Sequence, residues 1–252
     1  MEPVFRTLEI AARVAVRVTG TRITYYGLDN IPSTGGAVMA INHTGYIDFL
    51  PAALAAHHRK RRMRFMIKAE MADVKVVNWL IKHTKTIPVD RQAGAGAYTA
   101  AVAALRDGEI VGVYPEATIS RSFELKEFKT GAARMALDAQ VSIVPIIVWG
   151  AHRMWTKDHP KALGRKKFPV SVSAGEPIPP VGTADELGTT LRASMAQLLD
   201  KAQRGNPHPG GAWWVPRRLG GTAPTLQRAK VLDEAELAER ARKRAEREAS
   251  SN

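Results

Sequence analysis

Apolar and polar positions follow two different periods along the chain, which predicts a domain of alternating strands and helices. Short apolar runs rich in β-branched residues favour strands, and longer runs that repeat every three to four positions favour helices. The predicted strands are residues 22–26, 37–41, 64–68, 86–89, 110–114, 143–149 and 170–174. The predicted helices are residues 48–57, 72–83, 95–106, 130–139 and 185–202. This order is typical of an α/β fold with a mostly parallel or mixed central sheet flanked by helices.

The N-terminal segment differs from this region because its pattern is that of an amphipathic helix. Its charged residues are three or four positions apart and fall on one stripe of a helix, while the other positions are largely apolar. These charged residues are Glu2, Arg6, Glu9, Arg13 and Arg17. The helix either docks on its own domain or lies at a membrane interface, and both can hold together. We therefore separate residues 1–20 from an α/β domain at residues 21–204.

The C-terminal segment, residues 205–252, has a third composition. Residues 205–225 are rich in glycine and proline and predict a linker. Residues 226–248 are mostly Ala, Glu, Arg and Lys and predict a single charged helix outside the core. The pair Trp213 and Trp214, followed by Arg217 and Arg218, fits either packing against the core or an anchor at a membrane interface.

Composition narrows the classes of function. The 252 residues carry a formal net charge of +13, which implies an anionic partner such as a membrane surface, a phosphorylated substrate or nucleic acid. Nucleic acid is the weakest of these options because aromatic residues are only 6% of the chain and no nucleic-acid-reading motif is present. The sequence contains no cysteine, which excludes a cysteine nucleophile and a zinc-thiolate site. No apolar run is long enough to predict a transmembrane helix.

Two dense basic clusters lie at residues 57–64 and 164–168. Each is either a solvated loop or a contact for lipid headgroups or coenzyme A phosphates.

The candidate chemistry begins where the second predicted strand ends, at the sequence AINHTGYID. A histidine serves as a general base when one ring nitrogen faces the substrate and an acceptor holds the other. Asp48 follows His43 by five positions, which suits a turn between strand and helix. The pair is therefore a candidate base and its orienting carboxylate. The alternative is an ordinary turn histidine followed by a helix cap.

Two other predicted strand ends carry polar groups of complementary kinds. The sequence VYPEATISRS, residues 113–122, offers the carboxylate of Glu116, the hydroxyl of Thr118 and the guanidinium of Arg121. The sequence TIPVDRQ, residues 86–92, offers Arg91, which can bind an anion. Because ligands of α/β sheets gather where strands end, these groups are candidates for one site.

Taken together, these segments resemble the lysophosphatidic acid acyltransferase (PlsC-like) family of glycerolipid acyltransferases. The resemblance covers roughly residues 20–180 and rests on four ordered blocks. They are matched by Asn42, His43 and Asp48, by residues 87–91 ending in Arg91, by residues 114–120, and by the Val-Pro strand at residues 144–147. Three positions depart from the family pattern. Ala117 replaces a glycine, Ile119 replaces an arginine associated with the substrate phosphate, and Pro88 stands where an aromatic residue is common.

The resemblance implies transfer of a fatty acyl group from acyl-coenzyme A, or an acyl carrier protein, to 1-acyl-glycerol 3-phosphate, giving phosphatidic acid. It implies His43 as general base and Asp48 as its partner, with no covalent intermediate, metal or other cofactor. The implied substrate-binding residues are Asn42, Arg91, Glu116, Ala117, Thr118 and Arg121. Either Arg121 or the pair Lys126 and Lys129 can take the place of the missing arginine. We expect a peripheral enzyme on the cytoplasmic side of the membrane, bound to its anionic surface. The alternatives are acylation of glycerol 3-phosphate or another lysophospholipid, or a non-catalytic basic module that binds membrane or nucleic acid.

Overall fold

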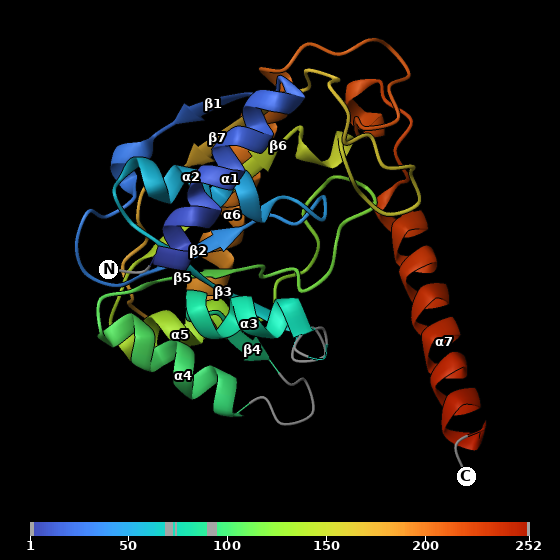
Figure 1. Cartoon of the computed structure of the whole chain (residues 1–252). Helices are drawn as coiled ribbons and strands as arrows, with labels where there is room; N and C mark the ends of the chain where they lie inside the picture. Colours follow the sequence, from blue (N-terminus) through green and yellow to red (C-terminus); the bar gives the residue numbers. More distant parts are fainter. Residues whose placement is uncertain (1–2, 69–72, 74, 90–94, 251–252) are drawn as a thin grey trace.

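The centre of the fold is a seven-stranded mixed sheet in the order β1-β7-β6-β2-β5-β3-β4 (Figure 1). The computed structural model describes residues 3–68, 73, 75–89 and 95–250. The strands are β1 (Arg22–Tyr26), β2 (Ala37–Ile41), β3 (Met63–Lys68), β4 (Ile87–Val89), β5 (Ile110–Val113), β6 (Ile143–Trp149) and β7 (Pro169–Ala174). Neighbouring strands are parallel except β6 and β7, which run antiparallel.

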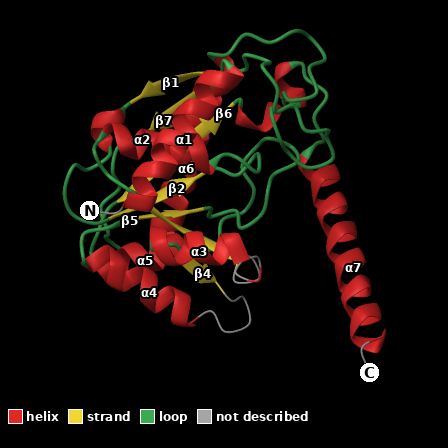
Figure 2. Ribbon diagram, in the orientation of Figure 1, coloured by secondary structure: helices red, strands yellow, loops and turns green. Residues whose placement is uncertain are grey.

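Helices cover both faces of the sheet, so the strands at its centre are buried on both sides (Figure 2). The helices are α1 (Pro3–Thr19), α2 (Phe49–His58), α3 (Lys75–Thr84), α4 (Ala95–Arg106), α5 (Gly131–Ala139), α6 (Ala184–Arg204) and α7 (Leu226–Ser250). In β2, Val38 and Ala40 pack with α4, α5 and α6, while Met39 and Ile41 pack with α2 on the other face. This alternation follows from the two-residue period of a strand.

The longest helix of the domain, α6, shows how local sequence sets an element. Thr183 and Glu186 form a reciprocal capping box, in which each side chain accepts the main-chain N–H of the other residue. The side chains that repeat every four positions along α6 are buried against the sheet: Leu187, Leu191, Met195 and Leu199. The helix therefore starts at a defined residue and presents one apolar stripe to the core.

Helix α1 packs outside the sheet layers, against α2 and α3, and contains no buried residue. Glu9 on its inner side lies 3.2 Å from Arg62 and 3.4 Å from His57. The outer side carries Ile10, Val14 and Val18, which are all more than half exposed. Helix α1 thus docks on the domain and leaves an apolar stripe exposed on the surface.

The arginines of the basic cluster at residues 57–64 bind within the molecule. Arg59 pairs with Asp29, and Arg61 donates to main-chain oxygens of three residues of other loops. Arg62 pairs with Glu9, and Arg64 pairs with Glu109. These arginines are therefore held by internal partners and are not simply solvated, while contact of the cluster with anionic ligands stays a prediction.

The segment 205–225 packs back on the domain, although it has little regular structure. Trp213 and Trp214 contact the core, and Ala212, Val215 and Ala223 are buried. Of the two alternatives for the tryptophan pair, the structure therefore shows packing against the core. Helix α7 starts where this segment ends and extends away from the rest of the molecule (Figure 1).

The predicted fold class is confirmed, and the predicted elements match those observed to within a few residues. For the helix predicted at residues 72–83, positions 72 and 74 lie outside the described residues. The antiparallel pairing of β7 makes the sheet mixed, which the sequence left open. Among the residues that the structure describes, no helix combines the length and apolar character needed to cross a bilayer.

Candidate active site

Three loops meet at the edge of the sheet where β2, β5 and β6 end. These strands are adjacent and parallel, so their carboxyl ends lie side by side. The loop after β2 carries His43 and Asp48, the loop after β5 carries Glu116 and Arg121, and the loop after β6 carries residues 150–168. Hydrogen bonds join the first two loops, because the Ser120 N–H donates to the His43 carbonyl oxygen at 2.7 Å. The convergence expected from the sequence is present for these two loops.

His43 and Asp48 lie together, with 3.4 Å between His43 Nδ1 and Asp48 Oδ2. The His43 ring stacks on the Tyr114 ring, with 4.0 Å between centroids, and its side chain is 18% exposed. A carboxylate on Nδ1 fixes the proton there and leaves Nε2 as the acceptor. The ring is thus oriented on two sides and open on the third.

Asp48 is fully buried and is held by the backbone of its own turn. Its Oδ2 accepts the N–H groups of Thr44 and Gly45, both at 2.7 Å, and makes no helix-capping bond to α2. Burial raises the pKa of Asp48, while His43 and the two N–H groups oppose this shift. Gly45 is required because a Cβ there would lie 2.8 Å from the Trp155 carbonyl oxygen. The turn therefore needs both its glycine and its carboxylate.

Glu116 links the two loops from inside the protein. Its carboxylate accepts the His43 main-chain N–H at 2.8 Å and the Lys126 main-chain N–H at 2.9 Å. Burial outweighs these two donors and raises the pKa of Glu116 to about 7. These contacts position His43, whereas the substrate contact expected from the resemblance stays a prediction.

The raised pKa of Glu116 gives a testable pH dependence of stability. Between its usual value and pH 7, the native state holds a proton that the unfolded state has released, so stability falls as the pH rises. Glu116→Gln cannot titrate. The difference in unfolding free energy between the parent protein and this variant should fall by roughly 2 kcal/mol from pH 5.0 to 7.5. Urea denaturation at both pH values measures it.

The slope is the readout, because the glutamine amide faces a main-chain donor and costs stability at every pH. Glu234→Gln, at an exposed position of α7, is the control. Its unfolding free energy should change with pH as that of the parent protein does. A parent protein and a Glu116→Gln variant with parallel pH profiles would contradict the raised pKa.

Asn42 uses its side chain inside the sheet. Its Nδ2 donates to the Val148 carbonyl oxygen at 3.1 Å, and its Oδ1 accepts the Val148 N–H at 2.7 Å. The side chain is fully buried. It extends the ladder between β2 and β6 by one step beyond Ile41 and Ile146.

The block at residues 114–120 contains the positions that depart from the family pattern. Ala117 adopts φ of 59°, a left-handed conformation that glycine takes at lower cost. Ile119 is buried, so its position faces the interior. Thr118 accepts a hydrogen bond from Lys126 Nζ at 2.7 Å.

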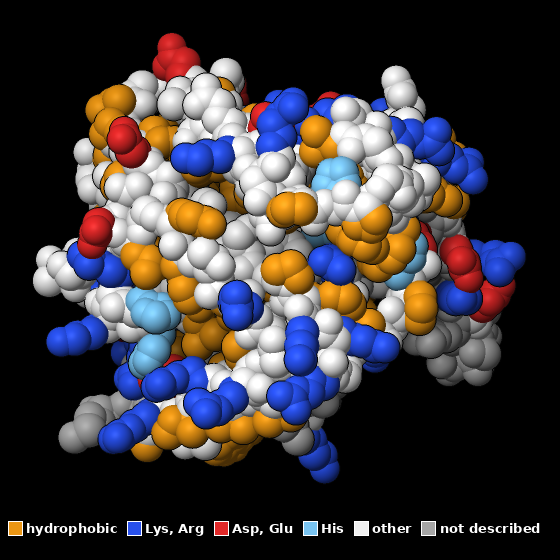
Figure 3. Space-filling model, turned by 90° about the horizontal axis from the view of Figure 1, so that it is seen from above, with side chains coloured by type: hydrophobic (Ala, Val, Ile, Leu, Met, Phe, Trp, Pro, Cys, Tyr) orange, Lys and Arg blue, Asp and Glu red, His pale blue; other side chains and the backbone are white. Residues whose placement is uncertain are grey.

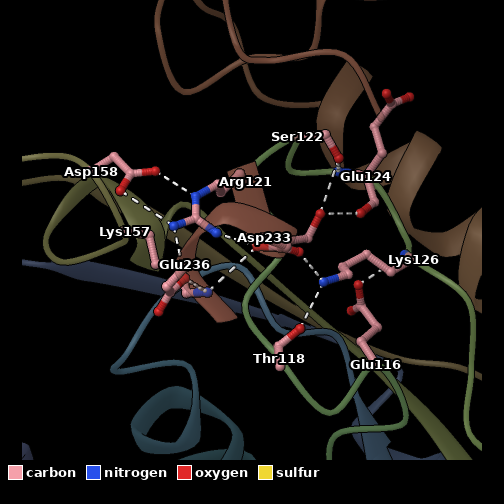
Figure 4. A network of polar contacts seen from close by, with 11 residues as sticks. Glu116, Thr118, Arg121, Ser122, Glu124, Lys126, Lys157, Asp158, Asp233 and Glu236 are labelled. Atoms are coloured by element: carbon pink, nitrogen blue, oxygen red, sulfur yellow. Dashed lines mark hydrogen bonds and ion pairs between the residues drawn. The ribbon is translucent and has the colours of Figure 1, made fainter. Parts of the chain in front are cut away.

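Arg121 is the centre of an ion-pair network (Figure 4). It contacts the carboxylates of Asp158, Asp233 and Glu236, and its side chain is 7% exposed. Lys126 and Lys157 bind the same α7 carboxylates. Arg91, the other expected phosphate ligand, lies outside the described residues.

Sequence reasoning did not identify Lys157, Asp158, Asp233 and Glu236 as neighbours of this site. They belong to no motif, and the two α7 residues follow a long glycine- and proline-rich segment whose path the sequence does not define. Within the described ranges, no group of three His, Asp or Glu side chains is arranged to hold a metal ion.

Several curated proteins similar to this chain are named as acyltransferases. The sequence profile of the Acyltransferase family matches residues 22–149. The 1-acyl-sn-glycerol-3-phosphate acyltransferase of Borreliella burgdorferi is 25% identical over 165 residues, which are 61% of this chain and 62% of that protein. The Bacillus subtilis protein of the same name is 29% identical over 51% of this chain and 63% of its own length. The chain thus spans a little under two thirds of these relatives.

The fold also matches a solved structure. The crystal structure of the 1-acyl-sn-glycerophosphate acyltransferase PlsC from Thermotoga maritima aligns with a TM-score of 0.69, over 82% of each chain and at 20% identity. At this identity the match concerns the fold. The family profile covers half of the chain and includes both His43 and Glu116. The chain therefore belongs to the acyltransferase family.

Proposed function

We propose that this protein transfers a fatty acyl group from acyl-coenzyme A, or an acyl carrier protein, to the free hydroxyl of 1-acyl-glycerol 3-phosphate. The observation that carries the proposal is the His43–Asp48 pair at the carboxyl edge of the sheet, with Nδ1 and Oδ2 3.4 Å apart. The similar proteins of Borreliella burgdorferi and Bacillus subtilis carry the name 1-acyl-sn-glycerol-3-phosphate acyltransferase, which supports this acceptor.

In the proposed reaction, His43 acts as general base in a direct attack. The acceptor hydroxyl gives its proton to Nε2 while its oxygen bonds to the thioester carbonyl carbon. The tetrahedral intermediate then collapses, the carbon–sulfur bond breaks, and the departing thiolate takes the proton from the imidazolium. Asp48 stabilises the imidazolium and keeps Nδ1 protonated. No covalent bond to the protein is needed.

Apolar groups on the catalytic turn suit the acyl chains of such substrates. Tyr46 and Phe49 flank Asp48 and are 42% and 44% exposed. The Tyr46 ring lies 4.9 Å from that of Trp155 in the loop after β6, and the Phe49 ring lies 6.0 Å from that of Phe65. Aromatic surface beside the base lowers the cost of placing hydrocarbon there.

Release of free coenzyme A tests the proposal. The purified protein is mixed with palmitoyl-coenzyme A and, in separate reactions, 1-acyl-glycerol 3-phosphate, glycerol 3-phosphate or lysophosphatidylcholine. We expect acceptor-dependent release that is fastest with 1-acyl-glycerol 3-phosphate. Faster release of coenzyme A with another acceptor would identify that acceptor as the substrate instead. No release with any acceptor, from either acyl-coenzyme A or acyl carrier protein, would refute the proposed activity.

We also propose that the protein binds an anionic membrane surface through α1 and the loop at residues 163–167. Ile10, Val14 and Val18 form an exposed apolar stripe, and Arg6, Arg13 and Arg17 are exposed beside it. The loop continues this surface, because Lys167 N–H donates to the Thr19 carbonyl oxygen at the end of α1. Such a mixture of basic and apolar groups favours the interface of an anionic bilayer.

This surface adjoins the catalytic edge by topology. Strand β7 runs antiparallel to β6, and β1 runs parallel to β7, so β1 begins at the edge where β6 ends. Helix α1 leads directly into β1, and Thr21 Oγ1 lies 3.7 Å from Met154 Sδ in the loop after β6. On the face of the molecule seen from above in Figure 3, Lys and Arg side chains are interspersed with hydrophobic side chains. A lipid acceptor would therefore reach His43 from the bound surface.

Introducing charge into the stripe should weaken membrane binding. We expect Val14→Glu/Val18→Glu to lower partition onto vesicles containing phosphatidylglycerol by about tenfold or more, because two apolar contacts are lost and two anions approach an anionic surface. Vesicle sedimentation measures it. Val231→Glu/Leu237→Glu on α7 is the matched control, since those side chains are 51% and 60% exposed. An equal loss in both variants would contradict the assignment to α1.

A further inference from the structure

Three cations beside the candidate active site are neutralised by carboxylates, two of which belong to the C-terminal helix (Figure 4). Arg121 and Lys157 bind Glu236 at 2.8 and 2.6 Å, and both also contact Asp233. Lys126 contacts Asp233 as well. The third carboxylate, Asp158, belongs to the domain itself and is more exposed than the other two.

These cations are connected to the His43 turn by short hydrogen bonds. The main-chain N–H groups of Lys126 and His43 donate to the same carboxylate, that of Glu116. Lys157 follows Thr156, whose hydroxyl donates to the Thr44 carbonyl oxygen at 2.6 Å. The loops that carry the cluster are therefore tied by hydrogen bonds to the turn that carries the candidate base.

Helix α7 is attached to the domain mainly through this cluster. Asp233 and Glu236 lie about one turn apart on the inner side of α7. Ala229, one turn before Asp233, is buried. The apolar side chains Val231 and Leu237 point outward and are exposed. The remainder of α7 extends away from the domain (Figure 1). A helix held by charge with little apolar burial is easily displaced.

We propose that Arg121, Lys126 and Lys157 form the binding site for the acceptor's phosphate, and that Asp233 and Glu236 of α7 fill this site until the acceptor displaces them. The inference rests on the proposed function, since it names the acceptor contacts and an autoinhibitory segment of the same site. It also supplies cations at a site whose Ile119 cannot bind an anion.

The charges match those of the ligand. The cluster has three cations and three carboxylates, so removal of the two α7 carboxylates leaves two positive charges uncompensated. A phosphate monoester carries nearly two negative charges at neutral pH. Partial burial disfavours the charge of Glu236, yet Lys157 and Arg121 hold its pKa at about 2. The cations are therefore arranged to hold anions strongly.

Weakening the α7 contacts should favour the acceptor. The apparent affinity of a ligand equals its intrinsic affinity multiplied by the fraction of protein whose site is free. A docked α7 lowers this fraction and therefore raises the acceptor's KM. Asp233→Asn/Glu236→Gln keeps the shapes of the side chains and removes their charges. We expect the KM for 1-acyl-glycerol 3-phosphate to fall about tenfold, equivalent to about 1.4 kcal/mol, with kcat nearly unchanged.

Glu234→Gln/Glu239→Gln is the matched control, because it removes the same charge from exposed positions of the same helix. Its KM should equal that of the parent protein. An unchanged or higher KM in Asp233→Asn/Glu236→Gln would overturn the inference and leave the ion pairs with a structural role. A fall of the same size in both variants would overturn it too, because net charge alone would then explain the effect.

Direct binding separates this inference from the proposed activity. Calorimetric titration with sn-glycerol 3-phosphate should show about tenfold tighter binding to Asp233→Asn/Glu236→Gln than to the parent protein. If the variant binds sn-glycerol 3-phosphate more tightly but no acyl transfer is measured, the proposed activity alone is refuted. If the variant and the parent protein bind it with equal affinity, the anion site is refuted. If the variant does not fold, hydrogen exchange of the parent protein decides. Saturating sn-glycerol 3-phosphate should speed exchange in residues 226–240, and unchanged exchange would overturn the inference.

Discussion

Replacing His43 by alanine should lower kcat for acyl transfer by about a hundredfold or more, while the protein stays folded. A positioned general base contributes on this scale, because the acceptor hydroxyl must lose its proton as it attacks. The ring is held by Asp48 Oδ2 at 3.4 Å and by stacking on Tyr114, which orients it for this role. Coenzyme A release at saturating substrates measures the loss.

We expect His43→Ala to remain folded, because the ring makes one long hydrogen bond and the N–H groups of Thr44 and Gly45 still hold Asp48. His83→Ala is the control, since His83 is exposed at the end of α3, before β4 starts at the opposite edge of the sheet. Circular dichroism and urea denaturation establish that both variants fold. Near-normal turnover by folded His43→Ala would exclude His43 as the base.

The convergence of His43 and Glu116 could be predicted because it follows from strand topology. Each residue comes directly after a buried apolar run, and such runs form parallel central strands in an α/β fold. Parallel neighbours end at the same edge, so residues 73 positions apart in the sequence come within hydrogen-bond distance. Local periodicity thus carries information on long-range contacts wherever the sheet is parallel.

The surroundings of Arg121 could not be predicted in the same way. Its partners Asp233 and Glu236 are more than 100 positions away and follow a segment without periodicity. No strand register relates them, so their position depends on how residues 205–225 pack. The pairing direction of β7 was open for a similar reason, because a strand pattern does not specify whether the preceding loop reverses the chain.

Asn42 shows how a motif can place a structural residue next to a candidate catalytic one. The resemblance implies a substrate contact for it, next to the histidine. In the structure both polar atoms of its side chain bond to the main chain of Val148. The amide therefore holds β2 against β6 at the point where the His43 turn begins, and its neighbour is placed as a consequence. Sequence alone does not separate these two roles.

Asn42→Ala should consequently lower the unfolding free energy by about 3 kcal/mol. The substitution leaves the N–H and carbonyl of Val148 without these partners in a fully buried strand, and each orphaned group costs about 1–3 kcal/mol. Asn30→Ala is the matched control, because its amide makes one partly exposed bond, to the Ala174 carbonyl oxygen at 3.0 Å. That loss should be within about 1 kcal/mol.

Urea denaturation of the two variants and the parent protein measures the difference. The acceptor KM of folded Asn42→Ala should remain close to the parent value, because the side chain is enclosed between β2 and β6 and does not reach the surface of the site. The opposite pattern, a raised KM with unchanged stability, would assign Asn42 to the substrate. Because kcat depends on how well His43 is placed, a moderate fall in kcat together with the loss of stability fits the structural role, in which the sheet end supports the base.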